Sequence, residues 1–189
     1  MKKTYNYPGL VRLFEDAIQQ AERFKSISGD LISLKPNPSS WSAGEIFEHI
    51  VRFKTIYLRA IHRTLDSGTP IITENPGFRP RKLMSYFIKT VRPPYKMKIK
   101  TITPMKPVDT SAEEYYIYLA QVIEMNKKII EQLNELETRK IDLDRVKGKN
   151  PLFKFNMTLT EFYLMLDAHQ QRHFWQAENT LKEISEKTN

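Results

Sequence analysis

Two histidines near the end of the chain, His169 and His173, are spaced so that they can hold one metal ion. They lie in segment 158–176, where Thr158 and Glu161 have the spacing of a capping box, which predicts that a helix begins there. Side chains four residues apart are neighbours on one helix face, with Cβ atoms about 5–6 Å apart. Two imidazoles at this spacing can bind a single ion between them. The spacing alone is equally consistent with two histidines that bind no metal and only pack in the core.

A third histidine, His49, is expected on the inward face of another helix. Ser42 and Glu45 form a second capping box, and the helix that follows is predicted over residues 42–66 with His49 inside its apolar stripe. The fourth histidine, His62, is predicted to lie at the surface. Three imidazoles from two helices suit zinc, nickel, iron or manganese and leave positions open for water or substrate. Because the chain has no cysteine, metal ligands are limited to imidazole, carboxylate and water.

The elements that must position these histidines are four long amphipathic segments. Apolar residues recur at helical spacing over residues 7–25, 42–66, 111–136 and 158–184. No strand pattern is evident, and segment 139–149 is predicted to be exposed because it is highly charged. The sequence therefore predicts an all-α four-helix bundle, and its 189 residues favour a single domain over residues 1–189.

The connection over residues 70–109 is long, basic and rich in proline. It holds seven of the eleven prolines and is predicted to be irregular, apart from a short helix at 82–91 with Leu83, Phe87 and Val91 on its inner side. Segment 79–100 contains eight basic residues: Arg79, Arg81, Lys82, Lys89, Arg92, Lys96, Lys98 and Lys100. No acidic residue occurs between residues 75 and 108, and the remaining 22 basic residues equal the 22 acidic ones. The net charge of +8 therefore belongs to this connection.

The basic segment 79–100 has two interpretations. We expect a loop that closes over the metal pocket and whose cations meet an anionic cofactor or substrate. Binding of nucleic acid or anionic lipid is the less favoured interpretation, because no nucleic-acid motif is present and prolines interrupt any amphipathic membrane helix.

The distribution of apolar residues along the chain bears on where in the cell the protein is found. No segment reaches the roughly 18–20 apolar residues that a membrane span needs, and the N-terminal residues lack an apolar leader. We therefore expect a cytoplasmic protein. A homodimer is possible for a bundle of this kind, although no apolar stripe marks an interface.

Two motifs resemble those of the DinB/YfiT-like superfamily. The run WSAGEIFEHI at 41–50 is similar to that family's Trp-Ser-x-x-Glu entry to helix two, which ends in a histidine, and HQQRHFWQ at 169–176 resembles its closing His-x-x-x-His-x-x-Gln. The resemblance covers essentially the whole chain, with the basic segment as its least similar part. It implies a four-helix bundle in which three histidines bind zinc or nickel. The matching positions here are His49, His169 and His173.

The resemblance leaves the reaction open. The family includes transferases that use a low-molecular-weight thiol, bacillithiol or mycothiol, and members labelled as hydrolases. A hydrolase usually needs a general base, yet Gln170 stands where a zincin has glutamate, and Glu48 and Asp167 are expected to point away from the metal. We therefore favour a metal-dependent thiol transferase acting on a small molecule. A metal-dependent hydrolase is the second hypothesis, and a non-catalytic bundle that binds a metal or an anion is the third.

Three further polar residues are candidates for the site. Gln176 lies one turn beyond His173 and is expected either to hydrogen-bond a ligand or substrate or simply to lie at the end of the bundle. Asn126 falls on an inward stripe and needs a partner if it is buried. Arg172 is expected to point sideways and pair with an acid, with binding of an anionic substrate as the less favoured role.

Overall fold

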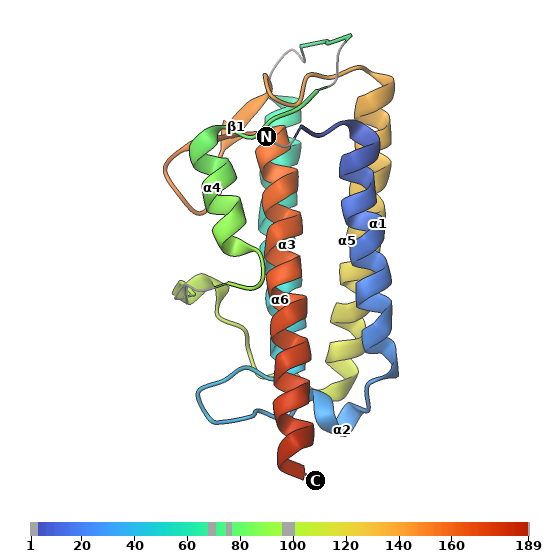
Figure 1. The fold of residues 1–189 in the computed structure, drawn as a ribbon, viewed down its shortest axis with the longest axis vertical. Helices are drawn as coiled ribbons and strands as arrows, with labels where there is room; N and C mark the ends of the chain where they lie inside the picture. The colour runs from blue at the N-terminus through green and yellow to red at the C-terminus, as the bar shows by residue number, and fades with distance from the viewer. Residues whose placement is uncertain (1–3, 68–70, 75–76, 96–100, 189) are drawn as a thin grey trace.

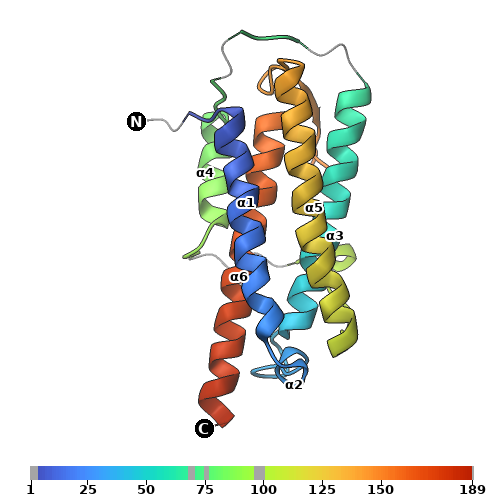
Figure 2. The same cartoon turned by 90° about the vertical axis from the view of Figure 1, so that its right-hand side faces the viewer.

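Four long helices lie side by side in the computed structural model, which describes residues 4–67, 71–74, 77–95 and 101–188 (Figures 1 and 2). They are α1 (Tyr7–Arg23), α3 (Ala43–Asp66), α5 (Ala112–Thr138) and α6 (Leu159–Thr188). The smaller elements are α2 (Gly29–Ile32), α4 (Lys82–Val91), the 3₁₀ turns Phe24–Ser26 and Thr103–Met105, and strands β1 (Lys147–Lys149) and β2 (Asn156–Thr158). The all-α four-helix bundle predicted from the sequence is confirmed.

Capping boxes begin three of the four long helices, as the sequence predicts. At the start of α3, Glu45 N–H donates to Ser42 Oγ (3.2 Å) and Ser42 N–H donates to Glu45 Oε2 (2.8 Å). Ser111 with Glu114 and Thr158 with Glu161 form the same pair of bonds before α5 and α6. Each box satisfies two backbone donors that have no partner within the helix, which fixes the residue at which the helix begins.

The core divides into two clusters along the bundle. One cluster packs the aromatic rings of α1, α3 and α6, with Phe14, Tyr57 and Phe162 fully buried. The second lies near the N-terminal end of α3 and contains Phe47 and Phe174. All four long helices contribute to both clusters, and the histidines lie on two of them, α3 and α6.

The connection 70–109 folds back onto the body, as expected, but its short helix is rotated from the prediction. The buried residues of α4 are Met84, Ile88 and Val91, whereas Leu83 is 79% exposed. The predicted inner residues and the observed buried residues both have helical spacing, and the packing of α4 on α6 decides which of the two faces is buried. The predicted inner position of Leu83 is therefore wrong.

The basic residues of this connection are not unopposed, because α6 supplies acids from far along the chain. Arg81 Nη2 lies 2.6 Å from Glu161 Oε2, and Arg92 forms an ion pair with Asp167. The side chains of both acids are at most 1% exposed. Lys82 and Lys89 are exposed, while Lys96, Lys98 and Lys100 lie outside the described residues. The connection is therefore tied to α6 at two points.

Segment 139–149 is not the exposed stretch that its charge predicts. Ile141 and Leu143 are buried, and Tyr7 Oη donates to the Ile141 carbonyl (2.6 Å). Strands β1 and β2 then pair antiparallel, with Lys147 opposite Thr158. Strands of three residues are too short to show an alternating pattern in the sequence. Among the described residues, no helix is both long and apolar enough to cross a membrane.

Candidate metal centre

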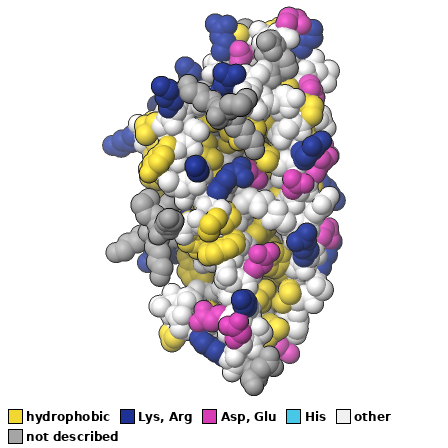
Figure 3. Space-filling view, in the orientation of Figure 1, with side chains coloured by type: hydrophobic (Ala, Val, Ile, Leu, Met, Phe, Trp, Pro, Cys, Tyr) yellow, Lys and Arg dark blue, Asp and Glu magenta, His cyan; other side chains and the backbone are white. Residues whose placement is uncertain are grey.

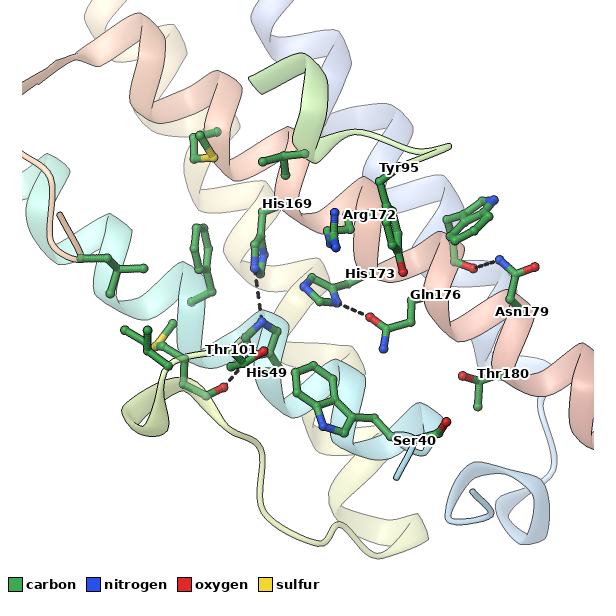
Figure 4. Close-up of a pocket in the computed structure, with 18 of the residues that line it drawn as sticks. Ser40, His49, Tyr95, Thr101, His169, Arg172, His173, Gln176, Asn179 and Thr180 are labelled. Carbon is green, nitrogen blue, oxygen red and sulfur yellow. Dashed lines mark hydrogen bonds between the residues drawn. The ribbon is translucent and has the colours of Figure 1, made fainter. Parts of the chain in front are cut away.

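Three histidines meet between α3 and α6. Ligand atoms of His49, His169 and His173 all lie within 4.8 Å of one another, and His49 Nε2 is 3.3 Å from His169 Nε2 (Figure 4). His49 and His173 are 4% and 6% exposed. The structure therefore brings together the three residues that the sequence singled out, and it places His62 on the exposed side of α3.

Hydrogen bonds at Nδ1 orient two of the three rings. His49 Nδ1 donates to the carbonyl oxygen of Met105 at 2.7 Å, because a carbonyl can only accept. His173 Nδ1 lies 2.9 Å from Gln176 Oε1 and donates to it in the same way. With the proton at Nδ1, each neutral ring keeps its lone pair at Nε2. Such hydrogen bonds are typical of histidines that ligate a metal.

His169 completes the group but is incompletely satisfied by the protein alone. Its ring stacks on Phe53, with centroids 3.5 Å apart and planes 6° apart. The contact with His49 Nε2 is a hydrogen bond only if His169 carries its proton at Nε2, and Nδ1 is buried without a partner among the described residues. A cation bound by the lone pairs of both Nε2 atoms removes the need for a proton between them, and the proton of His169 then lies at Nδ1. The residues present therefore fit a divalent metal ion.

Burial keeps these imidazoles neutral. The pKa of His49 is lowered to about 4, mainly by burial; the hydrogen bond to the Met105 carbonyl opposes the shift, and the nearby Arg52 adds to it. The pKa values of His169 and His173 lie well below the usual 6.5, first because of burial and then because each lies near other groups that can carry positive charge. Neutral imidazole is the form that binds a metal, so the site is ready at pH 7.

A pocket of about 500 Å³ opens beside the histidines. Its walls are mainly apolar and come from α3, α6, the connection 70–109, the segment before α3 and the loop before α6. Trp41, Phe87 and Trp175 are among the lining residues. Hydrophobic side chains are exposed in the middle of the face drawn in Figure 3, surrounded by charged ones. The connection contributes Tyr95, Thr101 and Met105 to the lining, so it lies at the pocket as expected.

The three further candidates have different surroundings. Gln176 lines the pocket and bonds His173. Arg172 also lines it, 8% exposed, with its guanidinium carbon 3.5 Å from the centroid of the Tyr95 ring, so it does not point sideways as predicted. Asn126 is fully buried, and its Oδ1 accepts from Lys54 Nζ at 2.6 Å. It is not among the described residues that line the pocket.

Buried carboxylates are more numerous than the sequence suggests. Asp167 and Glu48 are 1% and 5% exposed, paired with Arg92 and Arg52. Neither lines the pocket. The one carboxylate among the described lining residues is Glu183, which bonds Lys187 at 2.8 Å. Glu48 and Asp167 therefore point away from the metal site, as expected. Helix periodicity does not reveal that Asp167 is buried against an arginine of the distant connection 70–109.

Sequence reasoning missed two residues of the site. Met105 acts through its backbone carbonyl, which leaves no trace in residue type. Tyr95 stacks on Arg172, and the sequence gives no signal of this contact. Both belong to the proline-rich connection, whose path is set by tertiary contacts.

A model of the DinB superfamily matches residues 14–177, which is most of the chain. The chain belongs to the DinB superfamily. Two solved structures share the fold of this DinB protein. YfiT from Bacillus subtilis, described as a probable metal-dependent hydrolase with an unusual four-helix bundle topology, is 13% identical with a TM-score of 0.60, over 95% of this chain and 87% of YfiT. The colibactin self-resistance protein ClbS, solved in complex with a dsDNA, is 11% identical with a TM-score of 0.53, over 94% of this chain and 96% of ClbS.

A search of curated protein sequences gave no significant match. At these identities the two structural neighbours show the fold alone. The assignment to the DinB superfamily rests on the family model.

Proposed function

We propose that this DinB protein is a metal-dependent enzyme in which His49, His169 and His173 hold one divalent ion, with zinc and nickel as the first candidates. The observation that carries the proposal is the orientation of the rings, because Met105 and Gln176 hold protons at Nδ1 and leave Nε2 lone pairs on neighbouring rings. Such an ion supplies Lewis acidity for a thiol or a water molecule. The mainly apolar walls of the pocket give a small molecule a surface to bind.

Thiol transfer is the reaction that we favour. Glu183 is the carboxylate among the described lining residues and is bonded to Lys187, so the pocket offers no evident general base for activating water. A low-molecular-weight thiol brings its own nucleophile, which suits a chain without cysteine. Metal-dependent hydrolysis is the second candidate, and the description of YfiT supports it.

Turnover assays on metal-loaded protein separate the two reactions. We expect loss of the electrophile 1-chloro-2,4-dinitrobenzene to depend on added thiol and to fall at least about 100-fold in His49→Ala, with His62→Ala unchanged. Turnover of p-nitrophenyl esters without thiol would instead indicate the hydrolase. Metal binding with neither activity would favour the non-catalytic bundle, because the site would then be only a binding site.

Nucleic acid is not part of this proposal, although ClbS is described with a dsDNA. Arg81 and Arg92 are committed to buried acids of α6, which leaves fewer cations of segment 79–100 for phosphates. We expect no mobility shift of unrelated DNA at low salt, and a shift that weakens steeply with salt would contradict this. The cytoplasmic location and the homodimer both stay predictions.

A further inference from the structure

Helix α4 turns large apolar side chains toward solvent. Met84, Ile88 and Val91 face α6 and are buried, whereas Leu83 and Tyr86 are 79% and 69% exposed. Single exposed apolar residues are common at protein surfaces. These two are neighbours on one helix because they lie three residues apart, so their meaning depends on what lies beside them.

The hairpin formed by β1 and β2 places two aromatic side chains beside α4 (Figure 1). Phe153 and Phe155 in its loop are 48% and 39% exposed, and their rings stack with centroids 5.9 Å apart. Asn150 Oδ1 accepts from the backbone N–H of Phe153 at 2.8 Å, which helps to fix the loop. Arg81, just before α4, donates from Nη2 to the backbone carbonyl of Asn156 and so joins the helix to the hairpin.

Lysines accompany these apolar side chains. The α4–hairpin face consists of Leu83, Tyr86, Phe153 and Phe155 together with the exposed Lys82, Lys89, Lys149 and Lys154. Figure 3 shows hydrophobic side chains beside basic ones over α4. The face therefore combines apolar surface with positive charge.

The four lysines of the α4–hairpin face form no ion pair with any residue that the structure describes. The face is drawn from residues 75–108 and 145–160, and neither stretch contains an acidic residue. Glu161 and Asp167, which meet the connection from α6, are buried and paired with Arg81 and Arg92. A negatively charged surface is therefore the complement of this face.

We propose that the α4–hairpin face docks on the surface of an anionic lipid bilayer. A bilayer meets both properties of the face, since lysines are attracted to anionic headgroups while aromatic and aliphatic side chains enter the boundary with the acyl chains. The prolines that disfavour a membrane helix in this connection lie outside α4, at positions 80 and 93. The exposed side of α4 is therefore uninterrupted.

Two other occupants fit the face less well. A second copy of the chain, related by twofold symmetry, would set this surface against itself and bring lysine against lysine. The phosphates of a nucleic acid would complement the lysines but offer nothing to the exposed aliphatic side chain of Leu83. The docking rests on this face alone and does not depend on the proposed enzyme function, although Phe153 also lines the pocket.

Co-sedimentation of the full chain with lipid vesicles tests the proposal. We expect at least about tenfold stronger binding to phosphatidylcholine vesicles with about 30% phosphatidylserine than to phosphatidylcholine alone, with the difference shrinking as salt is raised. The double variant Leu83→Ser/Phe153→Ser should weaken binding to the anionic vesicles at least about tenfold, and Lys82→Gln/Lys154→Gln should do the same.

Matched controls come from α5, on which Ile117 and Lys127 are exposed. Ile117→Ser and Lys127→Gln remove side chains of the same kinds away from the face, so binding should stay within about twofold of the wild type. If the double apolar variant does not fold, as judged by circular dichroism, Leu83→Ser alone decides, with at least about threefold weaker binding expected.

No binding of the wild type to anionic vesicles at low salt would overturn the proposal. Binding weakened by the lysine variant but not by the apolar variant would also overturn it, because the face would then recognise charge alone, as for nucleic acid. Self-association that is lost in Leu83→Ser, measured by sedimentation velocity, would assign the face to a second copy instead. The assay needs neither metal nor turnover, so its outcome is independent of whether the chain is an enzyme.

Discussion

Gln176 is the side chain that most directly distinguishes a metal site from three packed histidines. It accepts from His173 Nδ1 at 2.9 Å, which leaves Nε2 of that ring as the ligand atom. Partners of this kind typically contribute 10–100-fold in metal affinity. Replacing the amide with an apolar group of similar size should therefore weaken binding without destroying the site.

We expect Gln176→Leu to raise the zinc dissociation constant about 10–100-fold while keeping one site per chain, as measured by competition with a chelating dye. Gln176→Glu is the matched variant and should bind zinc at least as tightly as the wild type, because a carboxylate accepts the same hydrogen bond more strongly. Equal affinities in Gln176→Leu and wild type would show that the contact with His173 does not support a ligand.

Lys54 is a second residue whose chemistry is set by burial. It is 1% exposed and donates to Asn126 Oδ1, and burial lowers its pKa to about 7, with Asp167 opposing the shift. Between pH 10.5 and pH 7 the unfolded chain takes up a proton at this lysine and the folded chain does not. The wild type should therefore lose stability as pH falls through this window.

Lys54→Met removes this titration. The free energy of unfolding of Lys54→Met relative to wild type should rise by on the order of 2 kcal/mol between pH 9 and pH 7, since one unit of pKa difference is about 1.4 kcal/mol. Urea unfolding at both pH values measures the change, and other titrating groups cancel in the comparison. A difference that does not vary with pH would mean that Lys54 stays protonated in the folded core.

Residue types and spacing were enough to place the three histidines on inward helix faces and Gln176 one turn beyond His173, whereas their role in holding a metal stays a prediction. Helix periodicity placed His49 inward because its neighbours Ile46, Ile50 and Phe53 are apolar. Periodicity could not show that Asn126 meets Lys54, or that Asp167 is buried against Arg92, because both depend on the approach of a distant segment. Polar residues on inward stripes were therefore recognised as needing a partner, but the partner could not be named.

At the scale of elements, α6 is the helix to which the rest of the site is attached. It carries two of the three histidines and receives Arg81 and Arg92 from the connection 70–109. These ion pairs tie α4 and the residues that lead into Tyr95 to α6. Removing one partner leaves a buried carboxylate without its cation, which is costly.

We expect Arg92→Met to destabilise the protein by about 2–4 kcal/mol, because Asp167 is 1% exposed and loses its arginine. Lys89→Met is the matched control on the same helix, and since Lys89 is exposed its change should stay within about 0.5 kcal/mol. Thermal or urea unfolding measures both variants. Equal stabilities of the two variants would show that the ion pair does not hold the connection.

The long helices were predictable because three begin at capping boxes and each carries a sustained apolar stripe. The face of α4 and the fold of segment 139–149 were not predictable. Ten residues of α4 allow two apolar stripes, and only contact with α6 selects Met84 and Ile88. Ile141 and Leu143 are isolated apolar residues in a charged stretch, so local composition hid their burial.

For the whole molecule, the bundle sets the distance between α3 and α6 and so brings His49 close to two histidines about 120 positions away. The helices explain where the site lies, and the connection supplies part of the wall of the pocket beside it. The central claim that follows is that the folded chain binds one divalent ion through His49, His169 and His173.

The most direct test is the metal content of tag-free protein, by inductively coupled plasma mass spectrometry after loading with zinc or nickel and removal of excess ion. We predict about one equivalent per chain in the wild type and in His62→Ala, whose histidine is exposed on α3. His49→Ala, His169→Ala and His173→Ala should each lose the ion while remaining helical by circular dichroism. Retention of one equivalent in all three variants, or no bound metal in the loaded wild type, would contradict the claim.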